Sequence, residues 1–221
     1  MNVIVFGSTG MVGQGVVREC LLDPEVLRVV TVVRAATGLA HDKLREIVHA
    51  DLSDLSTIAG ELAGLDACFY CLGASSSGLA EDAYRRITVG LTESVCEALI
   101  AAGGVRAMVF VSGAGSDNTG KSKVMWSRVK GLAENYVLAL PFETKCVFRP
   151  ALIQPRHGEV SKTRAYRVLY ALISPLMPVL RLVAGKHMTT TETVARAMLR
   201  VAKNGASQPI FENHEINALV T

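Results

Sequence analysis

The sequence predicts an α/β protein with a doubly wound parallel sheet, in which the strands take the order 3-2-1-4-5-6. Strand-like and helix-like stretches alternate over the first two thirds of the 221 residues. The strand-like stretches are continuously apolar, as expected of strands that are buried on both faces of a parallel sheet. A glycine-rich turn, Gly7–Gly13, joins the first strand directly to the first helix. Right-handed crossovers between parallel strands then favour helices on both faces.

Local signals place each element in turn. Three predicted helices end where a proline or glycine stops them: Met11–Leu22 before Pro24, about Asp82 to Ala102 before Gly103, and Lys123–Ala139 before Pro141. A shorter helix is predicted over Asp54–Leu62. The apolar runs between the helices are predicted strands: Asn2–Phe6, Arg28–Val33, Glu46–His49, Asp66–Cys71, Arg106–Ser112 and Lys145–Phe148.

The C-terminal part of the chain has a different character. Residues 163–184 have a helical composition that is interrupted by two prolines, Pro175 and Pro178. These prolines, together with Arg181, argue against a transmembrane span in this apolar stretch. We expect it to contact a second copy of the chain, a partner or a membrane surface. A helix is predicted over Thr191–Ala202 with Thr190 or Thr191 as its N-cap. We expect one domain over residues 1–221, with 151–203 as a substrate or cap segment.

Composition limits the classes of function. Half of the residues are hydrophobic and 19% are charged, which predicts a folded core. The net charge of +3, spread over scattered basic residues, argues against nucleic-acid binding. The first strand and glycine turn occupy the place of a secretory leader, so we expect none. Cys68 and Cys71 are three apart on a strand and face opposite sides. We therefore expect reduced core thiols, no metal site, and a cytoplasmic location.

The glycine-rich turn predicts an anion site. Unpaired N–H groups at a helix N-terminus attract a phosphate, and missing side chains let a pyrophosphate approach closely. The alternative is a tight turn whose glycines serve only packing. The residues expected to bind cofactor here are Gly7, Ser8, Thr9, Gly10, Met11, Val12 and Gly13.

Three further positions at strand ends are candidates for cofactor contacts. Arg34 follows the second strand where an NAD-specific site has a carboxylate, so it suits the 2′-phosphate of NADP, or it is a solvated arginine. Asp51 accepts a hydrogen bond from an adenine amino group, or it caps a turn at Ser53. Leu72 and Gly73 close the fourth strand, where a glycine lets the backbone lie against a ribose or serves a plain turn. We expect NADP as the cofactor, with NAD as the second option.

A second group of candidates surrounds the end of the fifth strand. Ser112 lies at the carboxyl edge of the sheet, where open α/β sheets bind ligands. It is not a hydrolase nucleophile, because that motif requires glycine where the chain has Phe110. Trp126 and Lys130 are four residues apart and share one helix face. Arg149 and Pro150, which follow the sixth strand, are expected at the rim of the same crevice.

These motifs resemble those of an atypical short-chain dehydrogenase/reductase of the NAD(P)-binding, epimerase-like group, and they are similar to the branch that includes the Tat-interacting tumour-suppressor protein. The resemblance covers roughly residues 2 to 203. It rests on the glycine motif, Leu72-Gly73, Val111-Ser112-Gly113, Lys130-Gly131 and Arg149-Pro150. It implies a Rossmann-like fold in which Ser112 holds a substrate carbonyl or hydroxyl. It also implies that Lys130 binds the nicotinamide ribose and lowers the pKa of a neighbouring acid.

The chain departs from this pattern at the proton donor. The family has Tyr-x-x-x-Lys, and Trp126 stands at the tyrosine position. An indole donates a hydrogen bond but exchanges no proton near neutral pH. Thr88 stands where the family often has a structural asparagine. His157 is a candidate replacement acid or a solvated loop residue, whereas Tyr84, Tyr166 and Tyr170 are expected to be packing residues.

Two functions therefore remain open at the level of sequence. The first is an NADP-dependent oxidoreductase or epimerase-like enzyme that acts on a small carbonyl or hydroxyl compound. The second is a catalytically impaired NADPH-binding regulator, a hypothesis that rests on Trp126. The sequence leaves open whether the protein is an enzyme.

Overall fold

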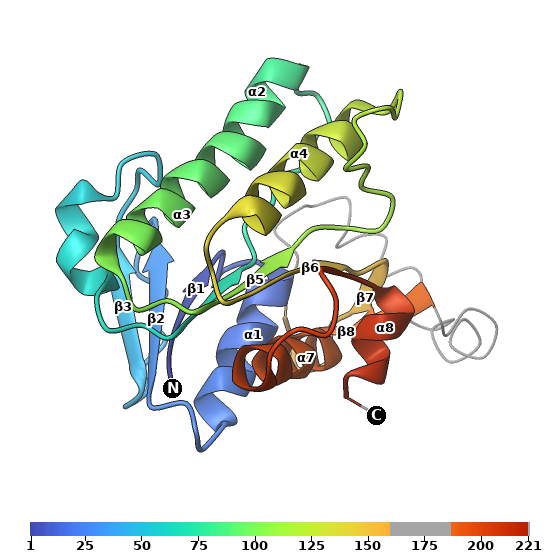
Figure 1. Ribbon diagram of the computed structural model, residues 1–221. Helices are drawn as coiled ribbons and strands as arrows, with labels where there is room; N and C mark the ends of the chain where they lie inside the picture. Colours follow the sequence, from blue (N-terminus) through green and yellow to red (C-terminus); the bar gives the residue numbers. More distant parts are fainter. Residues whose placement is uncertain (160–186, 221) are drawn as a thin grey trace.

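A seven-stranded parallel sheet organises the protein (Figure 1), in a computed structural model that describes residues 1–159 and 187–220. Its strand order is β3-β2-β1-β4-β5-β6-β9, and all its pairs are parallel. The strands are β1 (Asn2–Phe6), β2 (Arg28–Val33), β3 (Leu44–Val48), β4 (Ala67–Tyr70), β5 (Ala107–Val111), β6 (Thr144–Arg149) and β9 (Ile210–Glu212). A separate pair is formed by β7 (Leu152–Gln154) and β8 (Met188–Thr190).

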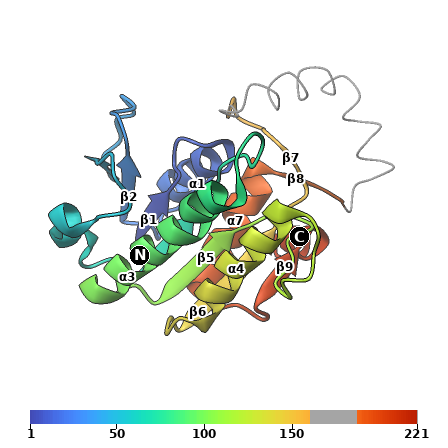
Figure 2. The same cartoon turned by 90° about the horizontal axis from the view of Figure 1, so that it is seen from above.

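Helices cover both faces of the sheet (Figures 1 and 2). On one face lie α1 (Met11–Leu22), α7 (Thr191–Asn204) and the short α8 (Asn213–Ala218). On the other lie the 3₁₀ segment η1 (Ser56–Leu62), α3 (Leu91–Ala102) and α4 (Met125–Ala139). The helix α2 (Glu81–Arg85) runs into α3 through a π-helical turn, η2 (Arg86–Gly90). The predicted doubly wound, Rossmann-like α/β fold is confirmed.

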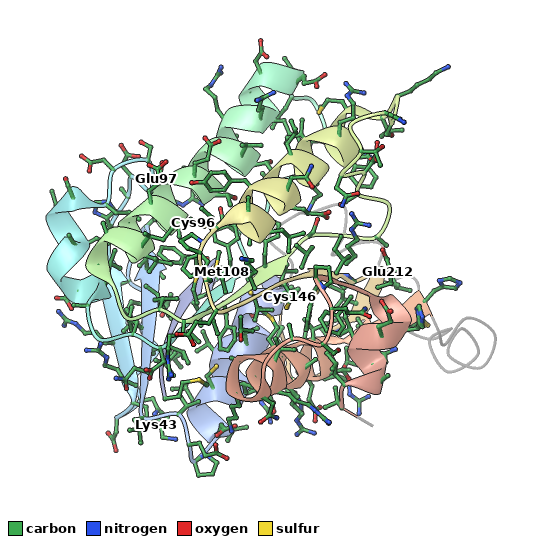
Figure 3. The ribbon with its side chains drawn as sticks, in the orientation of Figure 1. Lys43, Cys96, Glu97, Met108, Cys146 and Glu212 are labelled. Atoms are coloured by element: carbon green, nitrogen blue, oxygen red, sulfur yellow. The ribbon has the colours of Figure 1, made fainter. Side chains whose placement is uncertain are left out.

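Burial on both sheet faces explains the continuous apolar strands. Val3, Val5 and Phe69 pack against α1 and α7, while Ile4 and Met108 face α3 and α4. Figure 3 shows Met108 and Cys96 between the sheet and these two helices. Within the described residues all the cysteines are free thiols, and burial raises their pKa values. Cys68 and Cys71 belong to opposite cores, as the strand periodicity predicts.

The structure adds elements that the sequence analysis did not predict. β7, β8 and β9 are three residues long, too short for a recognisable periodicity. β9 extends the sheet beyond the predicted order by pairing with β6. The N-cap of α7 is Thr190, whose hydroxyl accepts a hydrogen bond from the Thr193 amide at 3.0 Å. The predicted segment 163–184 lies outside the described residues. No described helix is long and apolar enough to cross a membrane.

The π-helical turn modifies the helix predicted from about Asp82 to Ala102. The amide of Leu91 donates to the carbonyl of Arg86, five residues earlier. The Thr92 hydroxyl donates to the Thr88 carbonyl at 2.7 Å. One extra residue in the turn changes the phase of the helix, so that Tyr84 and Val89 are buried along with Thr92. Such turns occur frequently at functional sites.

Candidate functional site

The glycine turn between β1 and α1 is held by close backbone contacts. The amide of Gly10 donates to the Gly7 carbonyl at 2.9 Å. Gly7 has a φ of +80°, and a Cβ there would lie 2.5 Å from the Cys71 carbonyl. A Cβ on Gly13 would lie 2.1 Å from the Gly7 carbonyl oxygen. These two glycines are therefore required by the turn itself.

Gly10 differs from the other two glycines. Its backbone is extended, with φ −84° and ψ 162°, so a side chain causes no strain. Within 4 Å, a Cβ on Gly10 would meet only the Gly7 carbonyl oxygen, at 3.3 Å. Gly10 lines a cavity of about 490 Å³ at the carboxyl edge of the sheet. Gly10 therefore borders the cavity with no side chain of its own, and its Cβ position is less crowded than those of Gly7 and Gly13.

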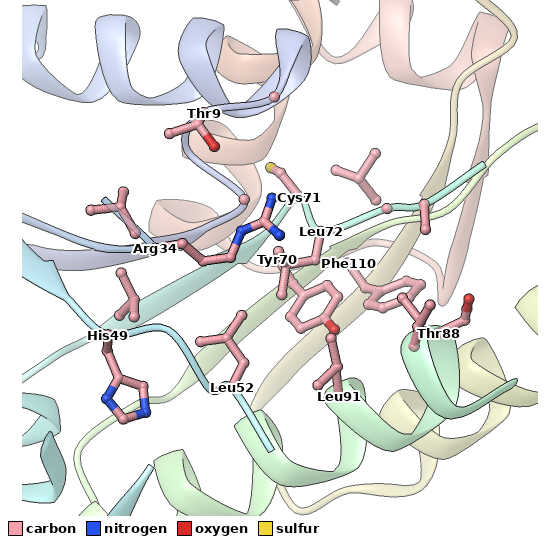
Figure 4. A pocket seen from close by; sticks show the side chains of 18 of the residues that line it. Thr9, Arg34, His49, Leu52, Tyr70, Cys71, Leu72, Thr88, Leu91 and Phe110 are labelled. Carbon is pink, nitrogen blue, oxygen red and sulfur yellow. The ribbon is translucent and has the colours of Figure 1, made fainter. Parts of the chain in front are cut away.

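This first cavity extends from the glycine turn across the ends of β2, β3 and β4 (Figure 4). Its floor includes the stacked rings of Tyr70 and Phe110, with centroids 5.0 Å apart. The cavity is also lined by residues that include Gly7, Thr9, Arg34, Asp51, Leu72, Gly73, Tyr84, Thr88 and Lys130. The cavity thus brings together most of the predicted cofactor residues.

Arg34 directly follows β2 and lines this cavity with its positive charge. Figure 4 shows its guanidinium extending toward Thr9 and Cys71. Among the described residues it forms no ion pair. Arg34 is therefore free to bind an anion inside the cavity.

Asp51 caps a turn and also lines the first cavity. Its Oδ1 accepts hydrogen bonds from the Ser53 hydroxyl at 2.6 Å and the Ser53 amide at 2.9 Å. These bonds lower the pKa of Asp51. Asp51 also lines the cavity, and Oδ2 takes no part in the turn. The turn-capping role of Asp51 is therefore confirmed, and its contact with a cofactor stays a prediction.

A second cavity of about 460 Å³ adjoins the first. It contains Ser112, Trp126 and Lys130, together with Met11 and Pro150. Four residues line both cavities: Gly73, Ala74, Tyr84 and Lys130. The two cavities therefore meet at Lys130, the residue expected to bind the nicotinamide ribose.

Ser112 and Trp126 are fixed by the loop between β5 and α4. The Ser112 hydroxyl hydrogen-bonds to that of Ser116 at 2.9 Å. The Ser127 hydroxyl donates to the Gly115 carbonyl at 2.6 Å. A Cβ on Gly115 would be 3.3 Å from Trp126 Cη2, so the indole lies directly against this glycine. The indole forms part of the wall of the second cavity.

Lys130 lies in a largely desolvated position on α4. Burial lowers its pKa, and the nearby carboxylate of Glu134 acts in the opposite direction. Glu134 is fully buried one helical turn further on. Lys130 therefore provides a positive charge in an environment of low dielectric, where its interaction with an anion is strong.

Several predicted site residues do not reach either cavity. Arg149 was expected at the rim, but its guanidinium binds Glu134 at 2.5 Å and Glu212 at 3.2 Å. Pro150, which was predicted together with Arg149, does line the second cavity. Val12 packs against the α1 core, and Gly13 serves the turn. Ser8 lines a separate cavity beside α1.

His157 is also placed away from the two cavities. Its Nε2 lies 3.0 Å from Glu192 Oε2, in contact with α7. It lines neither cavity, so the structure gives no support to a role as replacement acid. Within the described residues, no group of histidine, cysteine and carboxylate side chains is arranged to hold a metal ion.

Other lining residues were missed from sequence. Tyr70 and Phe110 lie in apolar strands, where an aromatic residue that lines a cavity has the same pattern as one in the core. Tyr84 and Thr88 are four apart on the helix after β4. That spacing places both residues on one face of the helix, and it is the sequence signal from which their shared position could have been predicted.

The profile of a family described as NAD(P)H-binding matches residues 7–140. The match extends from the glycine turn through α4 and includes Lys130. The chain belongs to the NAD(P)H-binding family. This NAD(P)H-binding protein is 30% identical over 177 residues to the mitochondrial protein fmp52 of Emericella nidulans, covering 77% of the chain and 74% of the relative. It is 32% identical over 164 residues to the mitochondrial protein fmp52-1 of Aspergillus oryzae, covering 72% and 68% respectively.

Solved structures share the fold of this NAD(P)H-binding protein at low identity. Gre2 of Candida albicans, in complex with NADPH, has a TM-score of 0.73 and 12% identity over 96% of this chain and 77% of that one. WbmF of Bordetella bronchiseptica, in complex with NAD+, has a TM-score of 0.69 and 18% identity over 99% and 76%. UDP-glucose 4-epimerase of Thermotoga maritima has a TM-score of 0.68 and 18% identity over 96% and 76%. The fold is thus that of NAD(P)-binding oxidoreductases and epimerases.

The comparisons correct the expected location. The fmp52 relatives are named mitochondrial proteins in Emericella nidulans, Aspergillus oryzae and Neurospora crassa. They point to a mitochondrial rather than a cytoplasmic location. Reduced cysteines were the basis for the cytoplasmic prediction, and free thiols alone do not distinguish one reducing compartment from another.

Proposed function

We propose that this protein is an NADPH-dependent oxidoreductase that acts on a small carbonyl or hydroxyl compound. The observation that carries the proposal is the position of Lys130, which lines both the cavity beside the glycine turn and the cavity of Ser112. A cofactor in one cavity and a substrate in the other would meet at this lysine. The resemblance to the Tat-interacting branch is part of the same proposal.

The first cavity suits a dinucleotide phosphate. Gly10 lines this cavity at the N-terminus of α1, where backbone dipoles favour an anion. Arg34 is available in the same cavity for a 2′-phosphate, and no carboxylate follows Val33 where NAD specificity requires one. We therefore assign NADP over NAD. Asp51 Oδ2 would accept a hydrogen bond from the adenine amino group, and Gly73 would lie against a ribose.

The second cavity suits a polar group on a small substrate. Ser112 would donate a hydrogen bond to the substrate oxygen from a position already held by Ser116. Lys130 would bind the nicotinamide ribose and stabilise negative charge that develops near it. When bound, NADPH supplies a hydride. We assign residues 151–203 to the cap of this cavity within one domain, an assignment that is supported by Ala151 and Ile153, which line it.

A steady-state assay tests the proposal. Purified protein should oxidise NADPH in the presence of at least one small aldehyde, ketone or sugar nucleotide. Lys130→Met should reduce kcat/KM by about 100-fold or more, the order expected for one preorganised charge at the reacting centre. Lys145→Met is the matched control, because Lys145 donates to the Leu140 carbonyl and lines neither cavity. Turnover that does not depend on Lys130 would contradict the proposed site.

Trp126 favours a second candidate, an NADPH-binding regulator without catalysis. The indole occupies the proton donor's place and packs on Gly115. This candidate predicts stoichiometric NADPH binding with no turnover of any carbonyl compound. The assay above separates the two functions, because both require the first cavity and only the oxidoreductase requires the second.

A further inference from the structure

We infer that Tyr84 is the catalytic acid of this site, supplying the proton that Trp126 cannot exchange. The inference rests on the proposed oxidoreductase function and extends it to a residue that the Tyr-x-x-x-Lys pattern does not include. Tyr84 belongs to α2 rather than α4, so a different helix would provide the phenol while Lys130 keeps its place.

Tyr84 lines both cavities. Of the four residues that line both cavities, Gly73 and Ala74 have no ionisable side chain. Tyr84 and Lys130 are the two that do. A group that transfers a proton to substrate during hydride transfer must reach the junction of the cofactor and substrate spaces. Tyr84 and Lys130 satisfy this requirement from opposite helices.

Tyr84 is held in place by burial and by a hydrogen bond. Its side chain is 1% exposed, and its hydroxyl is hydrogen-bonded to the Thr88 side chain one turn later. The π-helical turn that contains Thr88 begins two residues after Tyr84. An ion pair between Arg128 Nη2 and Glu81 Oε2, at 2.7 Å, ties α2 to α4. The helices that carry Tyr84 and Lys130 are therefore fixed to each other next to the two cavities.

Four other described side chains that could donate a proton fit this role less well than Tyr84. Tyr70 lines only the first cavity, and its hydroxyl is hydrogen-bonded to the Thr92 hydroxyl at 3.0 Å. Cys71 lines only the first cavity, and burial raises the pKa of its thiol. Ser112 is a hydrogen-bond donor whose hydroxyl is far too weak an acid to transfer its proton without a base. His157 contacts Glu192 outside both cavities.

The chemistry balances with Tyr84 in this role. In the reductive direction the carbonyl carbon accepts a hydride from the reduced dinucleotide, and the C=O π electrons move to oxygen. That oxygen takes the proton of the Tyr84 hydroxyl, giving the alcohol and the oxidised dinucleotide. The tyrosinate, in a site that also contains the Lys130 ammonium, then takes a proton from water. Burial raises the pKa of Tyr84, so the phenol keeps its proton near neutral pH and would release it only as negative charge develops on the substrate oxygen.

The test replaces a single oxygen atom. Tyr84→Phe should reduce kcat/KM for NADPH-dependent reduction of 4-nitrobenzaldehyde and methylglyoxal by about 100-fold or more. It should change the Kd for NADPH by less than about twofold. Tyr136→Phe is the matched control, since Tyr136 lies on α4 and lines neither cavity. Trp126→Tyr should restore part of the rate in the Tyr84→Phe background by placing a phenol at the family position.

A second measurement covers the case in which Tyr84→Phe is unstable. Incorporating 3-fluorotyrosine in place of Tyr84 keeps the ring and hydroxyl while making the phenol more acidic. The alkaline limb of the kcat/KM profile should then move to lower pH. Charged groups at this junction include Lys130, which lines both cavities as Tyr84 does, and the Glu81–Arg128 pair between α2 and α4. Neither is altered by the fluorine.

The outcomes separate the inference from the proposed function. Wild-type turnover that persists in Tyr84→Phe, or an alkaline limb that does not move with fluorine, overturns the role of Tyr84 and leaves the oxidoreductase standing. NADPH binding without reduction of either aldehyde by the wild-type protein also overturns it, and favours the regulator. A wild-type protein that binds no NADPH contradicts the proposed function itself.

Discussion

The guanidinium of Arg149 is bound to the carboxylate of Glu134, with 2.5 Å between Nη2 and Oε2. Glu134 lies one turn after Lys130 on α4 and is fully buried, and Arg149 ends β6. A second contact, from Arg149 to Glu212, reaches the residue that caps α8. The pair therefore joins the helix of Lys130 to the sheet and the C-terminal elements.

Breaking this pair should destabilise the fold. Arg149→Met leaves the Glu134 carboxylate buried without its partner, so the free energy of unfolding should fall by about 3–5 kcal/mol. Adding Glu134→Gln should recover part of the loss, because it removes the buried carboxylate charge that Arg149→Met leaves without its partner. Urea denaturation of the single and double variants measures both effects. An unchanged midpoint in Arg149→Met would show that the pair contributes nothing.

The glycines of the turn should divide into two classes. Gly13→Ala should lower the Tm sharply, since its Cβ would meet the Gly7 carbonyl oxygen at 2.1 Å. Gly10→Val should leave the Tm nearly unchanged and weaken NADPH binding by at least about tenfold, because the side chain enters the cavity. Thermal melts and calorimetric titrations distinguish the classes. Full NADPH affinity in Gly10→Val would place the pyrophosphate elsewhere.

Arg34 should control the choice between the two dinucleotides. Arg34→Asp repels a 2′-phosphate and offers a partner to a 2′-hydroxyl, so the NADPH-to-NADH affinity ratio should drop by about tenfold or more. Lys123→Asp is a control with the same charge change at an exposed position that lines neither cavity. If both variants change the ratio equally, Arg34 acts only through net charge.

The loop before α4 should be sensitive to acid. The Asp117 carboxylate accepts hydrogen bonds from the Thr119 hydroxyl and the Thr119 and Ser122 amides, which lower its pKa to about 2. Because the folded-state pKa is depressed, this stabilisation is present above the ordinary value of 3.8 and is lost as the pH falls toward 2. Trp126 is the only tryptophan in the chain, so its fluorescence reports on the loop. Asp117→Asn should remove the transition between about pH 4 and 2; a transition that remains in this variant would assign it to another group.

The sequence predicted the part of the fold that depends on local patterns. β1, α1 and β2 have the predicted bounds, because apolar runs and a glycine turn delimit them. β9 has only three residues and becomes a strand by pairing with β6, which no local pattern encodes. An arginine at the end of a strand, such as Arg149, gives the same sequence pattern whether it lines a cavity or forms an ion pair. Its partners, Glu134 and Glu212, are 15 and 63 residues away in the sequence, so no local pattern reveals them. Tyr84 has the sequence pattern of a packing residue, and only the fold shows that it lines the same two cavities as Lys130.

Calorimetric titration of the purified protein with NADPH and then NADH tests the central claim most directly. The account predicts one NADPH bound per chain, with an affinity at least about tenfold higher than for NADH because Arg34 meets the 2′-phosphate. NADPH binding should be at least about tenfold weaker in Gly10→Val and unchanged within about twofold in Tyr84→Phe. Absence of binding by both dinucleotides to the folded wild-type protein would contradict the cofactor site and every role derived from it.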